Sequence, residues 1–303
     1  MNKTIRRYFN GIAALSLLQL CSCAMGSRDS YSAPASNLPA EVSMNKFSPF
    51  APYLMVTLHL ESGTEFKCYV DTGSPSSVLP QSVESQLGKR IGKHKIRTLD
   101  GSIEKENIYA APKIYLGGAQ LVMGNRIGVW TNAEGILGMD CLRHYCIQLD
   151  FQTRKIRFLK SGKADESDFG KAFPLTNLQY AHIRQKEFFQ PNDSSLLVDT
   201  GDPFDGMMSS RLLKRAVQEE KARRVPIIMP PHFQGELPKL ELFSFPTCLW
   251  NGETYTNLVV QAGRVDLIGL KFLARHQVTF DFPEKVMYLK HSGERSGPIK
   301  ASP

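Results

Sequence analysis

The tripeptide Asp-Thr-Gly occurs twice, at residues 71–73 and 199–201, each time directly behind an apolar pair. A lone copy is an ordinary turn, but two copies in like surroundings indicate that two Asp side chains are meant to meet. Carboxyl groups in contact cannot both ionise, so they share one proton. The ionised partner can take a proton from water while the protonated one polarises a carbonyl. We therefore predict that Asp71 and Asp199 form an acid–base pair that activates water for hydrolysis without a metal or other cofactor.

The chain around the two motifs is an internal repeat, which indicates two similar structural units. In each copy a strand-like run, at 53–60 and 178–185, precedes the strand that leads into Asp-Thr-Gly. A short helix and several strands follow. The closing segments, 136–159 and 267–290, align without gaps and match Gly138 to Gly269 and Leu142 to Leu273. Gly138 follows Asp71 at nearly the spacing at which Gly269 follows Asp199, which two unrelated turns would not share.

The doubled arrangement resembles the aspartic proteases of the retropepsin and pepsin type, and most of all a single-chain bacterial retropepsin-like form. The resemblance covers about residues 47–291. It implies a mostly β fold with two pseudo-symmetric, retropepsin-like β-barrel lobes, at 47–165 and 166–303. It also implies an active site between the lobes, short helices after each Asp loop and an extended polypeptide substrate. Because both lobes lie in one chain, we expect a monomer.

The residues beside each Asp should support the pair. Gly73 and Gly201 lack a Cβ, so their loops can turn sharply and approach each other, with the N–H groups aimed at the carboxylates. The resemblance implies that Thr72 and Thr200 hydrogen-bond across the axis, and that the hydroxyl of Ser74 donates to the outer carboxylate oxygen.

The second copy departs from the family pattern, because Asp202 follows Gly201 where the family usually has Ser, Thr or Ala. A further carboxylate beside the dyad adds like-charge repulsion and should raise its affinity for protons. Alternatively, Asp202 points outward and binds the substrate backbone or a basic side chain. Asp205 adds to the acidity of this loop.

A hairpin flap should fold over the substrate. In the first copy we place its tip at 98–102, with Asp100 and Gly101 as the turn. The corresponding stretch of the second copy, 225–240, is longer and rich in Pro. Its apolar residues either line substrate pockets or pack into the core; they are Ile227, Ile228, Met229 and Phe233.

The N-terminus has the pattern of a targeting segment. Basic residues precede an apolar stretch at 11–20 that is too short to span a bilayer. The letters LCSC that follow resemble a bacterial lipobox, with Cys23 as the lipidated residue. We therefore predict a signal peptide at 1–23 and an exported protein anchored to a bacterial membrane, periplasmic or at the surface. Cleavage after Ala24, giving a secreted protein, is the alternative. Residues 24–46 are rich in Ser, Ala and Pro, and we expect a flexible tether.

Charge and composition exclude some other functions. The formal net charge of +8 is modest, and the densest basic run, 88–97, has no interleaved aromatic residues, so we expect no nucleic-acid partner. The seven His residues are scattered, so no zinc site is expected. Four Cys would remain after lipidation, at 68, 141, 146 and 248; they either form disulfides or serve as small core residues.

The sequence has no nucleophile elbow, zinc-protease motif or phosphate-binding loop. The alternative to a protease is a non-catalytic peptide-binding lipoprotein on the same fold, because a fold does not guarantee activity.

Overall fold

The computed structural model describes residues 41–43, 53–97, 103–131, 134–161, 169–185, 194–226 and 241–291. Cys23, the flap tip with Asp100 and Gly101, and the apolar residues at 227–233 lie outside the described residues, so the predictions made for them stay predictions. Within the described part of the chain, no helix is both long enough and apolar enough to cross a membrane.

The strands of the first half are β1 (Glu41–Ser43), β2 (Met55–Leu60), β3 (Glu65–Val70), β4 (Val78–Pro80), β5 (Gly92–Arg97), β6 (Ile103–Ala110), β7 (Ile114–Leu116), β8 (Ala119–Gln120), β9 (Arg126–Trp130), β10 (Gly135–Leu137), β11 (Cys146–Asp150) and β12 (Lys155–Leu159). Those of the second half are β13 (Lys171–Asn177), β14 (His182–Gln185), β15 (Ser194–Asp199), β16 (Gly206–Ser209), β17 (Arg223–Val225), β18 (Leu242–Trp250), β19 (Glu253–Gly263), β20 (Leu267–Gly269), β21 (His276–Asp281) and β22 (Val286–His291). The helices are short: η1 (Gln81–Gln86), α2 (Met139–Leu142), α3 (Ser210–Gln218) and α4 (Leu270–Leu273).

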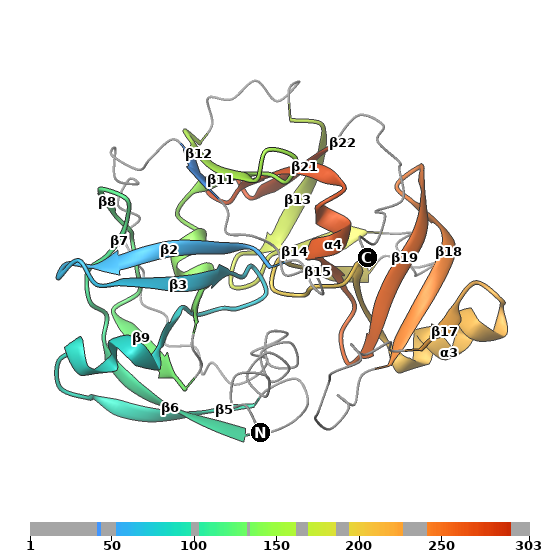
Figure 1. Cartoon of the computed structure of the whole chain (residues 1–303). Coiled ribbons are helices and arrows are strands. Elements are labelled where there is room, and N and C mark those ends of the chain that lie inside the picture. The colour runs from blue at the N-terminus through green and yellow to red at the C-terminus, as the bar shows by residue number, and fades with distance from the viewer. Residues whose placement is uncertain are drawn as a thin grey trace, which may run out of the picture.

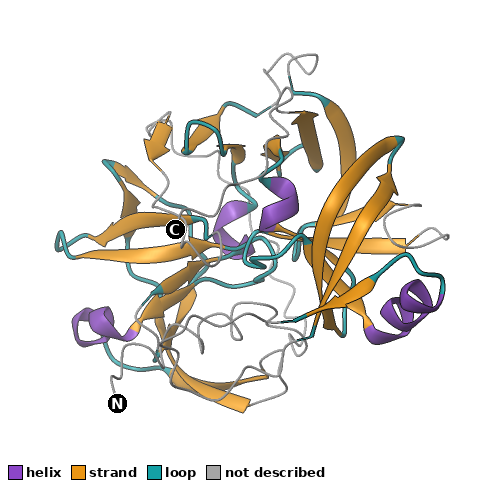
Figure 2. Cartoon of the chain, turned by 45° about the vertical axis from the view of Figure 1, so that its right-hand side comes forward, coloured by secondary structure: helices purple, strands orange, loops and turns teal. Residues whose placement is uncertain are grey.

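The strands form two large sheets, and Figures 1 and 2 show two lobes joined by strands that lie between them. The first lobe holds a 9-stranded sheet in the order β5-β6-β9-β4-β10-β3-β2-β7-β8. The second sheet has 13 strands in the order β1-β12-β11-β21-β22-β13-β14-β15-β20-β16-β19-β18-β17. Its first strands come from the N-terminal half, so one sheet ties the two halves together. The predicted mostly β, two-lobe fold is confirmed.

The two copies are related by a pseudo-two-fold axis that passes through the joining sheet. The segment β10-α2-β11-β12 repeats as β20-α4-β21-β22, as the gapless alignment predicts. Strands β11 and β21 pair antiparallel, and Gln148 lies opposite Thr279. These two residues are equivalents in the alignment, so the axis runs between them. Their side chains are also joined, with Gln148 Nε2 donating to Thr279 Oγ1 at 3.1 Å.

The burial of the strands explains why these sequences form this architecture. In β2, Val56, Leu58 and Leu60 are buried and alternate with more exposed residues, as in a sheet with one covered face. All of β11 is buried, because it runs between the lobes. The main hydrophobic cluster extends through both halves of the chain, from Leu54 to Leu289. Because this cluster is continuous, the lobes share one core. Each buried aliphatic side chain in it contributes about 1.5–3 kcal/mol to the stability of the fold.

Two expectations about the chain need correction. Residues 41–43, placed in the flexible tether, form β1 and pair antiparallel with β12, in the register Val42 to Ile156. The strand-like run at 178–185 is a strand only from His182 onward, because the preceding residues turn the chain back from β13.

Two further local features agree with the sequence. The hairpin of β18 and β19 turns at Asn251 and Gly252, both with positive φ, which suits a tight two-residue turn. The four described Cys residues are buried, and none forms a disulfide. The core reading therefore holds and no disulfide links them; burial raises the pKa of the Cys146 thiol to about 12.

Candidate active site

Parallel strand pairs place the Asp of each Asp-Thr-Gly motif at the same point of its lobe. In the first lobe β3 runs beside β10, and the N–H of Asp71, just past the end of β3, donates to Leu137 O at 3.0 Å. In the second, Asp199 ends β15 and pairs with Gly269 of β20. Each Asp loop is therefore anchored to the segment that the alignment matched, and both loops point to the axis.

The two glycines of the motifs bring the loops into contact across that axis. A Cβ at Gly73 would lie 2.4 Å from Cγ of Asp199, and a Cβ at Gly201 would lie 2.6 Å from Cγ of Asp71. Only glycine permits this approach. The N–H of Gly73 donates to Asp71 Oδ1, and that of Gly201 to Asp199 Oδ1, both at 2.8 Å. The structure thus brings the predicted pair together from opposite lobes.

The threonines lock the loops, as predicted. Thr72 Oγ1 donates to Val198 O at 2.6 Å, and Thr200 Oγ1 donates to Val70 O at 2.7 Å. Each hydroxyl also accepts the backbone N–H of the other threonine, at 3.0 and 3.1 Å. All of these groups are buried, so loss of a hydroxyl would leave unsatisfied polar atoms on both loops.

The electrostatics of the pair favour one shared proton. Asp71 is 2 % exposed and Asp199 is fully buried. Burial raises the pKa of Asp71 from 3.8 to about 6, although a hydrogen bond from the Asp199 side chain opposes this rise. Burial and then the nearby Asp71 charge raise the pKa of Asp199 well above its usual value. At neutral pH the proton therefore resides on Asp199 and the negative charge on Asp71.

Gly138 and Gly269 lie directly behind the two Asp loops. A Cβ at Gly138 would lie 2.6 Å from the backbone C and O of Ser76, and one at Gly269 would lie 2.4 Å from Phe204 O. Both contacts are with backbone, which cannot swing away as a flexible side chain can. These glycines let α2 and α4 pack directly against the Asp loops.

The predicted role of the Ser74 hydroxyl is not what the structure shows. Ser74 Oγ donates to Ser76 O at 2.8 Å, and a hydroxyl has a single proton to donate. The backbone N–H of Ser74 donates to the backbone carbonyl of Asp71 at 3.3 Å, so the Gly73 N–H is the backbone donor to the Asp71 carboxyl. The sequence predicts the residue next to the dyad but not the rotation of its side chain.

Asp202 does not point outward, so a direct contact with substrate is excluded for it. The residue is fully buried, and its Oδ1 accepts the N–H of Phe204 at 2.7 Å. The expectation that survives is the electrostatic one. Burial and then the neighbouring Asp199 raise the pKa of Asp202 to about 8.

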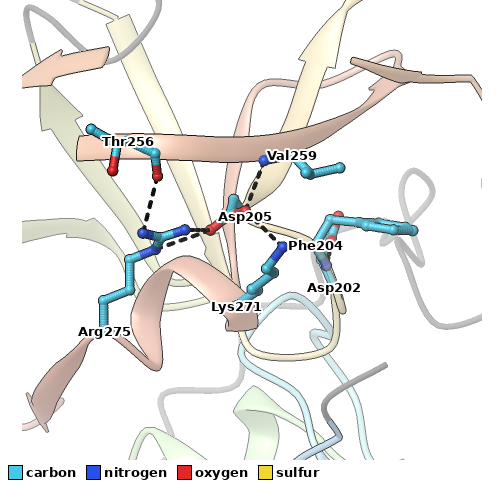
Figure 3. A network of polar contacts seen from close by, with 7 residues as sticks. All are labelled: Asp202, Phe204, Asp205, Thr256, Val259, Lys271 and Arg275. Carbon is cyan, nitrogen blue, oxygen red and sulfur yellow. Dashed lines mark hydrogen bonds and ion pairs between the residues drawn. The ribbon is translucent and has the colours of Figure 1, made fainter. Parts of the chain in front are cut away.

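Asp205 is also fully buried, but it has counter-ions, as Figure 3 shows. Its Oδ1 lies 3.1 Å from Arg275 Nη2, and its Oδ2 lies 3.5 Å from Lys271 Nζ. The N–H of Val259 also donates to Oδ2, at 2.8 Å. Asp205 therefore has two cationic partners, and its charge still raises the pKa of the nearby Asp202, as predicted for this loop.

These counter-ions were missed by sequence reasoning, although the alignment carried a signal. Ser77 and Asp205 occupy equivalent positions after the two motifs, and Asp140 and Lys271 occupy equivalent positions in the closing segments. In the first copy Ser77 Oγ donates to Asp140 Oδ1 at 2.6 Å. In the second copy the carboxylate belongs to the loop residue, Asp205, and the closing segment supplies the cation Lys271. The two differences, Ser77 to Asp205 and Asp140 to Lys271, together predict an ion pair between Asp205 and Lys271.

No cluster of His, Cys, Asp or Glu in the described ranges could hold a metal ion.

Of the comparisons with known proteins, the one with solved structures agrees with the fold. No family model matches the sequence, and no curated protein matches it. The structure is similar to the crystal structure of an aspartic proteinase from Irpex lacteus, with a TM-score of 0.56 and 16 % identity. The match covers 84 % of this chain and 98 % of that one. At this identity the similarity shows the fold alone, which is that of a pepsin-like, two-lobe protein.

Proposed function

We propose that this protein is an aspartic endopeptidase, in which Asp71 and Asp199 activate a water molecule to hydrolyse peptide bonds. The close approach of the two Asp loops carries this proposal, because each lobe supplies one buried Asp and each motif glycine lies against the Asp of the other lobe. The similarity to a solved aspartic proteinase supports the fold on which this chemistry would run.

The pKa order assigns a role to each carboxyl. Asp71, the more readily ionised partner, takes a proton from water as the water oxygen bonds to the substrate carbonyl carbon. Asp199 gives its proton to the carbonyl oxygen, which forms a neutral tetrahedral diol. The C–N bond then breaks as the leaving nitrogen takes the proton from Asp71. One diol hydroxyl returns its proton to Asp199, which restores the dyad.

The structure predicts an unusual acid limit for this reaction. Cleavage requires Asp71 ionised and Asp199 protonated. Activity should therefore fall as the pH drops below about 6, because Asp71 then becomes protonated and the dyad holds two protons. The test is incubation of the purified full-length protein with a diverse peptide library at several pH values between about 3 and 9, read by mass spectrometry. Peptide binding without cleavage at every pH would instead favour the non-catalytic peptide-binding lipoprotein.

We also propose that the substrate is an extended polypeptide that lies across the dyad between the lobes, covered by the hairpin whose tip is at 98–102. A single chain supplies both Asp loops, so a monomer would suffice.

The lipobox supports the further proposal that Cys23 anchors the protein to a bacterial membrane. Incorporation of a labelled fatty acid that is lost in Cys23→Ser would support it, and equal labelling of both proteins would contradict it.

A further inference from the structure

Asp202 is a third carboxyl group enclosed with the dyad. It follows Gly201 directly, and its N–H donates to Asp199 O at 3.3 Å. Its own carbonyl accepts the N–H of Leu270 at 2.7 Å, which fixes the backbone against α4. A Cβ at Gly269 would lie only 3.0 Å from Asp202 Oδ1, so the carboxyl is closely packed from behind. The side chain is therefore held in place and not free to turn toward solvent.

The hydrogen bonding of this carboxyl is incomplete. Oδ1 accepts one N–H, from Phe204, while Oδ2 is buried and has no hydrogen-bond partner among the described residues. The neighbouring cations do not compensate it, because Arg275 and Lys271 both contact Asp205, as Figure 3 shows. A buried carboxylate with one hydrogen bond and no counter-ion is costly, and such a group takes up a proton.

The titratable groups that act electrostatically on Asp202 in the described structure are acidic, while Lys271 and Arg275 contact Asp205 instead. The acidic groups are Asp199 on its own loop, Asp71 on the opposite loop, Asp205 on the following turn and Tyr53, which precedes β2. An added negative charge here would meet repulsion from each ionised neighbour. Burial and Asp199 accordingly keep the proton on Asp202 up to a pH of about 8.

The equivalent position of the first lobe is occupied by a group that is always neutral. Ser74 donates through its hydroxyl to Ser76 O, whereas Asp202 accepts from the N–H of Phe204, at the position equivalent to Ser76. The N–H of Met139 binds Ser74 O at 2.8 Å, as that of Leu270 binds Asp202 O. The backbone is thus conserved between the copies, while the second lobe has gained an ionisable group beside the acid partner of the dyad.

We propose that Asp202 is a positioning residue that stays a neutral carboxylic acid while the dyad works, and that its ionisation sets the upper pH limit of cleavage. This inference rests on the proposed function. An anion beside Asp199 would make Asp199 hold its proton more tightly. Asp199 would then polarise the substrate carbonyl less, and attack by water would slow.

The pH profile of cleavage tests this role, with each profile normalised to its own maximum. Asp202→Asn keeps the shape of the side chain but cannot ionise, and Asp202→Ser restores the group found at Ser74. Wild-type activity should decline around pH 8, and in both variants the decline should move upward by about one pH unit or more. The acid side should stay in place. Glu241→Gln, which removes an exposed carboxyl of the same lobe, should keep the wild-type profile. An unmoved alkaline side in both Asp202 variants overturns the proposal.

Stability provides a readout that does not need activity. Asp202 ionises only near pH 8 when folded but near its ordinary value when unfolded, so the folded state binds the extra proton between these limits. Its contribution to stability therefore falls as the pH rises through this window. Asp202→Asn should reduce the pH dependence by about one proton. If the wild type cleaves nothing, the proposed function fails, while this slope still decides the state of Asp202. Equal pH dependence of the free energy of unfolding in wild type and Asp202→Asn would refute a neutral, buried Asp202.

Discussion

Asp71→Asn and Asp199→Asn should each reduce peptide cleavage by about 10³-fold or more, since each removes one half of a general acid–base pair. An amide at position 71 cannot accept a proton from water. An amide at position 199 cannot supply the shared proton to the substrate carbonyl. Steady-state cleavage of a peptide found in the library screen measures both losses, and full activity in either purified variant would show that the dyad assignment is wrong.

The loss must occur in a folded protein. Asn has the shape of Asp and removes a buried carboxyl whose folded-state pKa is raised, so Asp71→Asn should not destabilise the protein. At neutral pH we expect its free energy of unfolding to rise by about 3 kcal/mol, from the shift of the Asp71 pKa from 3.8 to about 6.

Asp150→Asn is the matched control for the dyad variants. This carboxyl also lies at the end of a strand and is 8 % exposed, but it pairs with Arg157 at 3.2 Å. Its replacement should cost some stability and leave cleavage close to the wild-type rate. A large loss of cleavage in this variant would mean that Asp→Asn changes act through the fold.

Gly138→Ala has the second large expected effect, because the new methyl group would lie 2.6 Å from the backbone C and O of Ser76 and 2.9 Å from Ser74 O. Relief requires movement of the Asp71 loop itself. We expect a loss of about 3 kcal/mol or more in the free energy of unfolding, at the upper end for overpacking, together with loss of cleavage. Denaturant unfolding and the cleavage assay measure the two effects.

Gly118→Ala is the control for this change. Its Cβ would meet nothing within 4 Å, so stability should stay within about 0.5 kcal/mol of the wild type. Equal stability of the two alanine variants would contradict the close packing of α2 against the Asp71 loop.

The sequence was sufficient to predict the parts of the site that follow from duplication. Two Asp-Thr-Gly loops with Gly138 and Gly269 at like spacing constrain each other, because each loop needs a counterpart of the same shape. The cross-axis bonds of Thr72 and Thr200 were implied by the family resemblance and not by the spacing alone.

The predictions that were wrong concern side chains and a strand whose contacts leave no signal in the nearby sequence. Full burial of an unpaired Asp is rare, so nothing beside Asp202 in the sequence indicates that packing against Gly269 turns it inward. The Ser74 hydroxyl is directed by the nearest carbonyl, that of Ser76. Strand β1 exists because β12 offers a free edge, and three residues in a Ser- and Pro-rich stretch show no strand pattern of their own.

The shared proton can be observed directly by NMR of the ¹³C-labelled carboxyl groups of Asp71 and Asp199, assigned with the two Asn variants and followed through a pH titration. We predict that Asp71 titrates near pH 6 while Asp199 keeps its proton far above its usual range. If both carboxyls lose their protons together near pH 4, as separate exposed groups do, they do not share a proton and the proposed mechanism is wrong.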